Sequence, residues 1–91
     1  MNIFFMGTPE FSIPTLDLLN KIYNVIGVFT QPPRPSGRGM KKIKSSIQQY
    51  SEKNKLNFYT PNNLKKDEAL KLLVSLNPDL IVVVAYGLLI P

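Results

Sequence analysis

Ile3–Pro9, which reads IFFMGTP, decides the fold of this 91-residue chain. Its first four residues are all apolar, and such an unbroken run predicts a strand that is buried on both faces of a sheet. Gly7 and Pro9 then end the strand. Behind them, apolar residues recur at near-helical spacing, which predicts an amphipathic helix up to about Tyr23 with one inward face: Ile13, Leu16, Leu19 and Ile22.

The alternation of strand and helix continues along the chain. Apolar runs predict further strands at residues 25–29, 56–59 and 80–85, and helical patterns fall at 45–55 and 66–76. Alternation of this kind produces parallel strands joined by right-handed crossovers. We therefore predict an α/β fold, an incomplete doubly wound parallel sheet with the spatial strand order 3-2-1-4.

The last of these strands is the reason for expecting an incomplete sheet. Ile81–Val84 is apolar throughout, as in a central strand, yet the predicted order places it at an edge. Native proteins avoid an exposed hydrophobic edge. We therefore expect residues 1–91 to be the amino-terminal part of a larger domain.

Composition excludes several classes of site. The chain has no cysteine and no histidine, so it offers no disulfide, no thiolate and no imidazole base. It has no paired carboxylates and no cluster of metal-ligating residues, so we expect no metal. Its longest apolar run is far shorter than the ~20 residues of a membrane span, and its N-terminus lacks the basic flank of a secretory signal. We expect a cytoplasmic protein without a membrane partner.

The positive charge is concentrated in one stretch. Thr30–Lys44, with the sequence TQPPRPSGRGMKKIK, carries five of the eleven basic residues and no acidic residue, in a chain of net charge +5. Its prolines and glycines predict a flexible loop after the second strand. Such a loop is a typical place to grip an anionic partner, but a solvated connector has the same composition. Composition alone leaves both interpretations open.

Two other strand ends are candidate binding segments. Gly7–Phe11 follows the first strand but lacks the second and third glycines of a dinucleotide-binding turn, which excludes an NAD or FAD pyrophosphate site there. It is either a plain turn or one wall of a substrate site. Tyr86–Ile90 follows the last strand and is either a hydrophobic turn or an apolar slot for a flat ring system.

Three motifs together resemble the amino-terminal part of the methionyl-tRNA formyltransferase family. They are Phe5–Phe11 (FMGTPEF), residues 28–39 (VFTQPPRPSGRG) and residues 82–91 (VVVAYGLLIP), and their order and spacing match over the full length of the chain. The chain departs from the family pattern at three places in and after the basic stretch: Pro33, Lys44–Ser46 and Gln48.

The resemblance implies a Rossmann-like formyltransferase fold. It also implies transfer of a formyl group from 10-formyltetrahydrofolate, without a metal, to the methionyl amino group of initiator methionyl-tRNA. The residues that it implies for tRNA binding are Arg34, Arg38, Lys41 and Lys42. Those implied for the wall of the acceptor site are Gly7, Thr8, Pro9 and Phe11. Those implied for folate binding are Tyr86, Gly87, Leu88, Leu89 and Ile90.

The same resemblance implies that chemistry is missing from this chain. The catalytic Asn, His and Asp of the family lie beyond residue 91, as do the rest of the sheet and a C-terminal tRNA-binding domain. We therefore expect no catalytic residue in this chain, no activity of the chain alone, and a monomeric full-length parent.

Two alternatives remain open at this stage. One is a formyltransferase that acts on a small nucleotide or nucleotide-sugar, which would not need a long basic segment. The other is a non-catalytic basic α/β module that binds RNA, which would bind in a salt-sensitive way without requiring folate.

Overall fold

The computed structural model describes residues 1–36, 41–62 and 67–87. Strands and helices alternate along most of the chain, as the apolar pattern predicts. In chain order the elements are β1 (Asn2–Gly7), the short 3₁₀ helix η1 (Glu10–Ser12), α1 (Ile13–Ile22), β2 (Asn24–Phe29), β3 (Arg34–Ser36), β4 (Lys41–Ile43), α2 (Ser46–Lys53), β5 (Phe58–Tyr59), α3 (Asp67–Leu76) and β6 (Leu80–Val84).

Four of the strands form a parallel sheet in the order β5-β2-β1-β6. Counted along the chain, these are the third, second, first and fourth strands of the sheet. The predicted α/β class and the order 3-2-1-4 are therefore confirmed. β5 has only two residues and is shorter than the strand predicted at 56–59.

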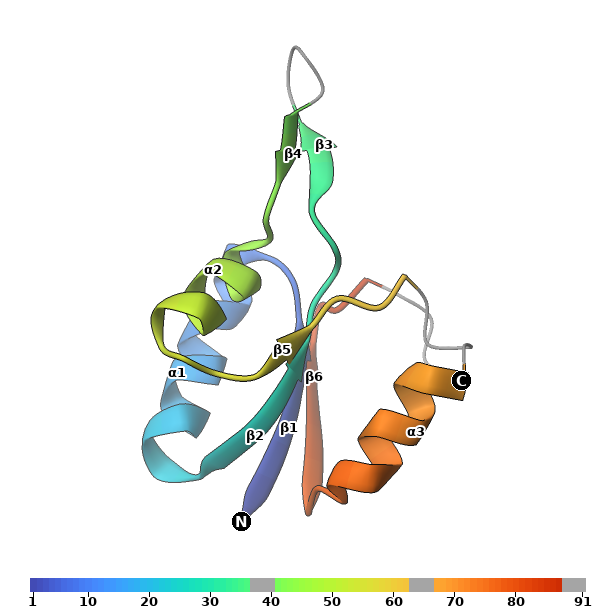
Figure 1. Ribbon diagram of the computed structural model, residues 1–91. Coiled ribbons are helices and arrows are strands. Elements are labelled where there is room, and N and C mark those ends of the chain that lie inside the picture. The colour runs from blue at the N-terminus through green and yellow to red at the C-terminus, as the bar shows by residue number, and fades with distance from the viewer. Residues whose placement is uncertain (37–40, 63–66, 88–91) are drawn as a thin grey trace.

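Helices cover both faces of the sheet (Figure 1). α1 and α2 lie on one face and α3 lies on the other. Because successive side chains of a strand point to opposite faces, β1 contributes Ile3 and Phe5 to one core cluster, and Phe4 and Met6 to the other. All four are at most 2% exposed, so β1 is buried on both faces as predicted.

The inward face of α1 is narrower than the spacing predicts. Leu16 is fully buried, but Ile22 is 59% exposed, so its assignment to the inward face was wrong. Ile22 is the last residue of α1, where the chain turns toward β2. α2 follows the pattern more closely, with Ile47 buried and Ser45 capping the helix by accepting a hydrogen bond from the Gln48 amide.

The basic stretch is not the loop that its composition predicts. β3 and β4 pair antiparallel and form a two-stranded ribbon, which we call the basic ribbon (Figure 1). The pairing opposes Arg34 to Ile43 and Pro35 to Lys42. Pro35 is tolerated because each strand of an isolated ribbon has one unpaired edge, and a residue without an N–H can sit there.

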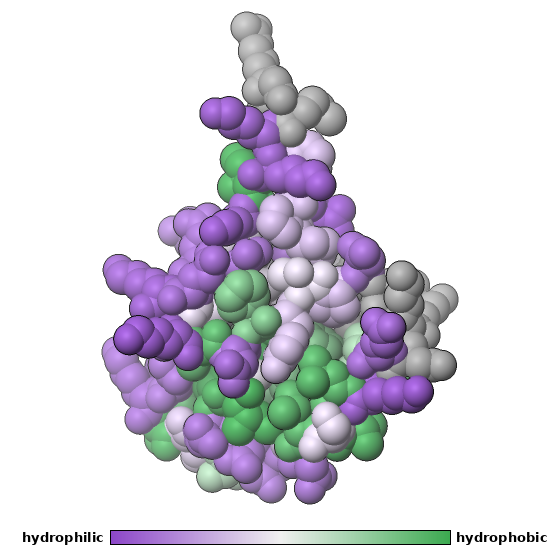
Figure 2. All heavy atoms as spheres, viewed as in Figure 1, coloured by the Kyte–Doolittle hydropathy of each residue, from purple (hydrophilic) through white to green (hydrophobic). Residues whose placement is uncertain are grey.

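The ribbon and the body of the molecule differ in polarity. Figure 2 shows mostly hydrophilic side chains over the ribbon, with one hydrophobic group among them, and many hydrophobic side chains gathered lower down, beside β5 and between the helices of the two faces. None of the helices in the described ranges is long and apolar enough to cross a membrane.

Candidate functional site

The carboxyl ends of β1, β2 and β6 meet at one edge of the sheet, and a polar network joins them. The Thr8 hydroxyl donates a hydrogen bond of 2.7 Å to the Tyr86 carbonyl. The Gln31 side-chain amide donates to the same carbonyl at 3.0 Å, and the Gln31 backbone N–H donates to the Thr8 hydroxyl at 3.3 Å. The segments after the first and last strands, which the sequence offered as separate candidates, therefore adjoin. Ligands of open α/β sheets bind at this edge.

The chain turns sharply after β6 to reach this network. Ala85 has a φ of +51° and Gly87 a φ of +92°, both in the left-handed region. At Gly87 a Cβ atom would also overlap the side-chain amide of Gln31. Glycine is required at 87 for both reasons, and the turn brings the Tyr86 carbonyl to Thr8 and Gln31.

The Tyr86 side chain lies in the core. Its ring is 2% exposed and stacks on Phe29, with 6.5 Å between the ring centroids. Burial raises the pKa of the Tyr86 hydroxyl to about 12. That hydroxyl has no hydrogen-bond partner among the described residues. The part of Tyr86 that reaches the network is thus its backbone. Of the other residues implied for folate binding, Gly87 is exposed, and Leu88, Leu89 and Ile90 lie outside the described residues.

The residues implied for the acceptor wall are placed in different surroundings. Gly7 is buried, and a Cβ there would collide with the Phe5 ring. Thr8 and Pro9 are half-buried. Phe11, in η1, is 69% exposed. Thr8 is the member that contacts the network directly.

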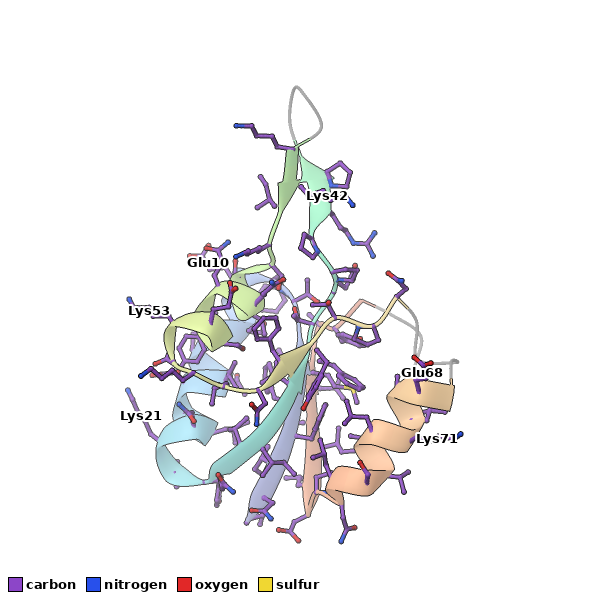
Figure 3. All side chains as sticks on the ribbon, in the orientation of Figure 1. Glu10, Lys21, Lys42, Lys53, Glu68 and Lys71 are labelled. Atoms are coloured by element: carbon purple, nitrogen blue, oxygen red, sulfur yellow. The ribbon has the colours of Figure 1, made fainter. Side chains whose placement is uncertain are left out.

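The basic ribbon presents its charges on two faces. Arg34, Lys41 and Lys42 are all exposed. Arg34 lies opposite Ile43, and since Lys41 is two residues from Ile43, Arg34 and Lys41 share a face. Lys42 lies on the other face, and Figure 3 shows its side chain extending from the ribbon. Arg38 lies outside the described residues.

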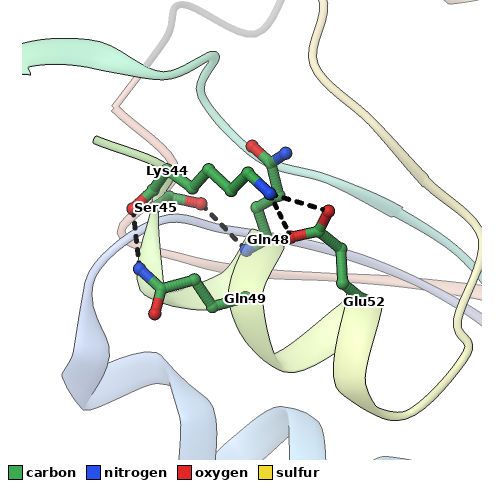
Figure 4. A network of polar contacts seen from close by, with 5 residues as sticks. All are labelled: Lys44, Ser45, Gln48, Gln49 and Glu52. Atoms are coloured by element: carbon green, nitrogen blue, oxygen red, sulfur yellow. Dashed lines mark hydrogen bonds and ion pairs between the residues drawn. The ribbon is translucent and has the colours of Figure 1, made fainter. Parts of the chain in front are cut away.

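Sequence reasoning missed the contacts at the base of the ribbon. The Thr30 and Ser45 hydroxyls are 2.7 Å apart and form a hydrogen bond, although fifteen residues separate them. Lys44 forms an ion pair with Glu52 of α2, with 3.1 Å between Nζ and Oε2 (Figure 4). The only signal in the sequence was position, because Thr30 follows a buried strand directly and Ser45 precedes a helical pattern.

A cavity of about 290 Å³ lies beside the carboxyl ends of β2 and β5, against the start of α3. Its lining includes the apolar side chains of Phe29, Tyr59, Pro61 and Leu72, and also Glu68 near the start of α3. None of the described residues implied for tRNA, acceptor or folate binding lines it.

In the parts of the chain that the structure describes, no group of three or more potential ligands for a metal ion comes together.

Comparison with known proteins identifies the family. The profile of the family described as formyl transferase matches residues 1–91. The chain is 46% identical over 92 residues to methionyl-tRNA formyltransferases of Rickettsia bellii (strain RML369-C) and Clostridium novyi (strain NT). It is 44% identical over 91 residues to that of Rickettsia rickettsii (strain Iowa).

Each of these alignments covers the whole chain but only 30% of the relative. The chain therefore spans less than a third of the length of the curated relatives it matches. The resemblance based on three motifs is confirmed over the full chain, and the fold agrees with it. The chain belongs to the formyl transferase family and corresponds to its amino-terminal region.

Proposed function

We propose that this chain is the amino-terminal part of the catalytic domain of an initiator methionyl-tRNA formyltransferase. In this proposal the basic ribbon binds the tRNA, and the edge formed by Thr8, Gln31 and Tyr86 borders the reaction site. The similarity to three methionyl-tRNA formyltransferases supports the substrate. A cytoplasmic location, expected from composition, belongs to the same proposal.

One observation carries the proposal: the basic ribbon rises from the same edge of the sheet as the strand-end network. Thr30 and Gln31 connect β2 to the ribbon, and Gln31 is itself part of the network. A nucleic acid held by Arg34, Lys41 and Lys42 would therefore lie at the end of the sheet that carries Thr8. Exposed cations of this kind bind phosphates and position the nucleic acid without reading its sequence.

The described residues give the folate a limited contact surface. The formyl donor would supply the carbon that is transferred. Because the Tyr86 ring is packed on Phe29, a folate would meet the exposed backbone turn at Gly87 rather than that ring. Thr8 and Gln31 would hold this turn in place through the Tyr86 carbonyl. The surface thus binds and orients, and no base or acid of this chain is assigned to proton transfer.

The chain alone is proposed to be inactive. It contains no histidine, and the described part of the edge holds hydroxyl and amide groups but no carboxylate in contact with them. A purified 91-residue chain, incubated with methionyl-tRNA and 10-formyltetrahydrofolate, is expected to give no formylmethionyl-tRNA. Measurable formylation by the chain alone would overturn this part of the proposal.

A chimera tests the function itself. Residues 1–91 would replace the matching segment of the Clostridium novyi relative, which is 46% identical, and formylation of methionyl-tRNA would be measured. We expect an active chimera. In a triple variant, methionine replaces Arg34, Lys41 and Lys42, and kcat/KM should fall by about 10- to 100-fold. The slope of the logarithm of the tRNA association constant against the logarithm of the salt concentration should become shallower by about 2 to 3.

The matched control replaces three exposed lysines outside the ribbon, Lys53, Lys55 and Lys71, with Met. It removes the same charge and should leave kcat/KM nearly unchanged. Equal losses in both triple variants would contradict a specific role of the ribbon. An inactive chimera that still binds RNA would favour a non-catalytic module, and activity on a free nucleotide but not on tRNA would favour the small-substrate alternative.

A further inference from the structure

The basic ribbon stands away from the rest of the molecule. Figure 1 shows it projecting beyond the sheet and its helices, so the sheet does not hold its far end. Two short connections join it to the body. Residues 30–33 lead from β2 into β3, and residues 44–45 lead from β4 into α2. The orientation of the ribbon therefore depends on these connections.

A hydrogen bond joins the two connections to each other. The Thr30 hydroxyl lies 2.7 Å from the Ser45 hydroxyl, and Thr30 is fully buried. Each residue is also fixed to the body. The Thr30 N–H donates to the Tyr59 carbonyl at 3.1 Å, and the Ser45 hydroxyl accepts from the Gln48 N–H at 2.9 Å. A partly buried hydroxyl pair anchored at both ends favours one geometry over others.

A second set of contacts holds the β4 side. Lys44 extends along α2 to Glu52, with its Nζ 3.1 and 3.2 Å from the two carboxylate oxygens. The Gln49 side-chain amide donates to the Lys44 carbonyl at 3.0 Å (Figure 4). The side chain and the backbone of Lys44 are thus both tied to the same helix.

We propose that Thr30, Lys44, Ser45 and Glu52 form a clasp that fixes the angle of the basic ribbon on the sheet. Lys44 is then a positioning residue, because its charge is paired with Glu52. For Arg34, Lys41 and Lys42, by contrast, the described residues offer no ion-pair partner. Six residue steps separate Thr30 from the end of β3, which is about 20 Å of extended chain. A rotation of roughly 10° at the clasp would therefore move that end by about 3 Å, enough to break phosphate contacts.

The orientation can be measured without any ligand, so this test does not depend on the proposed function. The chain has no cysteine, which allows spin labels at Leu18→Cys on α1 and Lys41→Cys on β4. Pulsed electron spin resonance should give a single narrow distance distribution. Thr30→Val and Glu52→Gln should each broaden it, and the matched control Lys53→Met should not. Unchanged distributions in both clasp variants would overturn the proposal.

A charge swap separates positioning from anion binding. Lys44→Glu alone should broaden the distance distribution, and Lys44→Glu combined with Glu52→Lys should narrow it again because the ion pair is restored. Glu52 is exposed, so its variants retain the Thr30–Ser45 contact and the fold even if Thr30→Val does not. Failure of the swap to restore the distribution would contradict the role of Lys44.

Binding of a tRNA acceptor-stem hairpin provides a second readout, which rests on the proposed function. If Lys44 positions the ribbon, Lys44→Met and Glu52→Gln should both weaken binding, by about two- to fivefold. If Lys44 instead contacts phosphate, Glu52→Gln should strengthen binding, because it frees a cation and removes a nearby anion. Strengthened binding would overturn the positioning role. Absence of any RNA binding, with the distance changes present, would count against the proposed function only.

Discussion

The backbone and the side chain of Tyr86 lie in different surroundings. Its carbonyl accepts hydrogen bonds from Thr8 and Gln31 at the edge of the sheet, and its ring is buried on Phe29. The ring brings a hydroxyl into the core, where it has no partner among the described residues. An unpaired buried hydroxyl costs free energy, so its presence calls for a test of what it contributes.

Replacing Tyr86 with Phe should leave the free energy of unfolding at pH 7 unchanged or raise it. Above pH 10 the free energies of unfolding of the wild type and of Tyr86→Phe should diverge. The unfolded tyrosine ionises near pH 10, whereas burial holds the folded pKa at about 12. Below pH 10 the buried, neutral Tyr86 therefore causes no pH-dependent loss of stability. As the pH rises to 12, the free energy of unfolding of the wild type should fall by on the order of 2 kcal/mol relative to that of Tyr86→Phe.

Urea unfolding at pH 7, 10 and 12 checks this difference. Tyr23→Phe is the matched control, since it removes a hydroxyl from a ring that is 42% exposed. It should follow the wild type at every pH. A difference between wild type and Tyr86→Phe that stays constant from pH 7 to 12 would contradict the assigned cause.

Gly87→Ala should destabilise the chain by about 2 kcal/mol. A left-handed φ costs an L-residue roughly 1–2 kcal/mol, and the new methyl group would displace the Gln31 amide from the Tyr86 carbonyl. Adding Gln31→Ala should relieve the collision but not the backbone strain. In a double-mutant cycle measured by thermal unfolding, the double variant should therefore be more stable than the sum of the single effects. Strict additivity would show that the collision does not occur.

At the scale of elements, α1 and α2 are coupled through one carboxylate. Asp17 of α1 accepts a hydrogen bond of 2.6 Å from the Tyr50 hydroxyl of α2 and forms an ion pair with Lys21. The hydrogen bond from Lys21, followed by that from Tyr50, lowers the pKa of Asp17. Burial, with the hydrogen bond to Asp17 next in importance, raises the pKa of Tyr50. The contact thus favours a charged Asp17 beside a neutral Tyr50.

This coupling predicts part of the acid sensitivity. Because the folded pKa of Asp17 is lower than the unfolded value of about 3.9, its contribution is present above that pH and is lost as the pH falls through the folded pKa. Asp17→Asn should therefore show a smaller drop in Tm between about pH 5 and pH 2 than the wild type. Glu10→Gln, which removes an exposed carboxylate, should keep the full drop. An equal drop in Tm between pH 5 and pH 2 in the wild type and both variants would contradict the prediction.

How far the sequence predicts an element depends on its length and its partners. β1 and β6 were evident because four or more apolar residues in succession signal a strand buried on both faces. β2 was evident because only Gly27 interrupts its apolar run. β3 and β4 were not, since each has three residues, most of them polar or proline, and is a strand only through its pairing with the other. Pairing is a contact between segments, and the pattern within one segment does not reveal it.

The candidate site was predictable in its location and not in its contacts. Thr8 and Gly87 were found because both follow buried strands, and parallel strands bring their carboxyl ends to one edge. The inward packing of the Tyr86 ring depends on the left-handed turn at Ala85, a residue type that gives no sign of such a φ. The link between Lys44 and Glu52 depends on the angle between the ribbon and α2, which only the folded chain defines.

At the scale of the whole molecule, the two edge strands of the sheet differ in how well they are covered. β5 is an edge of only two residues, with α2 packed beside it. β6 is five residues long, and in the described structure it pairs with β1 alone. Three of its apolar side chains are 41–48% exposed: Leu80, Ile81 and Val83. That the sheet continues beyond β6 in a larger domain stays a prediction, and this exposed edge is what such a sheet would cover.

An exposed apolar edge strand offers unpaired N–H and C=O groups to a neighbouring molecule, so the isolated chain should self-associate as its concentration rises. Val83→Lys places a charge on β6 and should move the onset of association to a concentration about tenfold higher. Sedimentation equilibrium over a range of concentrations measures this shift. Val74→Lys is the matched control, because Val74 is 76% exposed and belongs to α3 rather than to a strand. If both lysine variants delayed association equally, added net charge would be the cause, and the chain would associate through something other than the β6 edge.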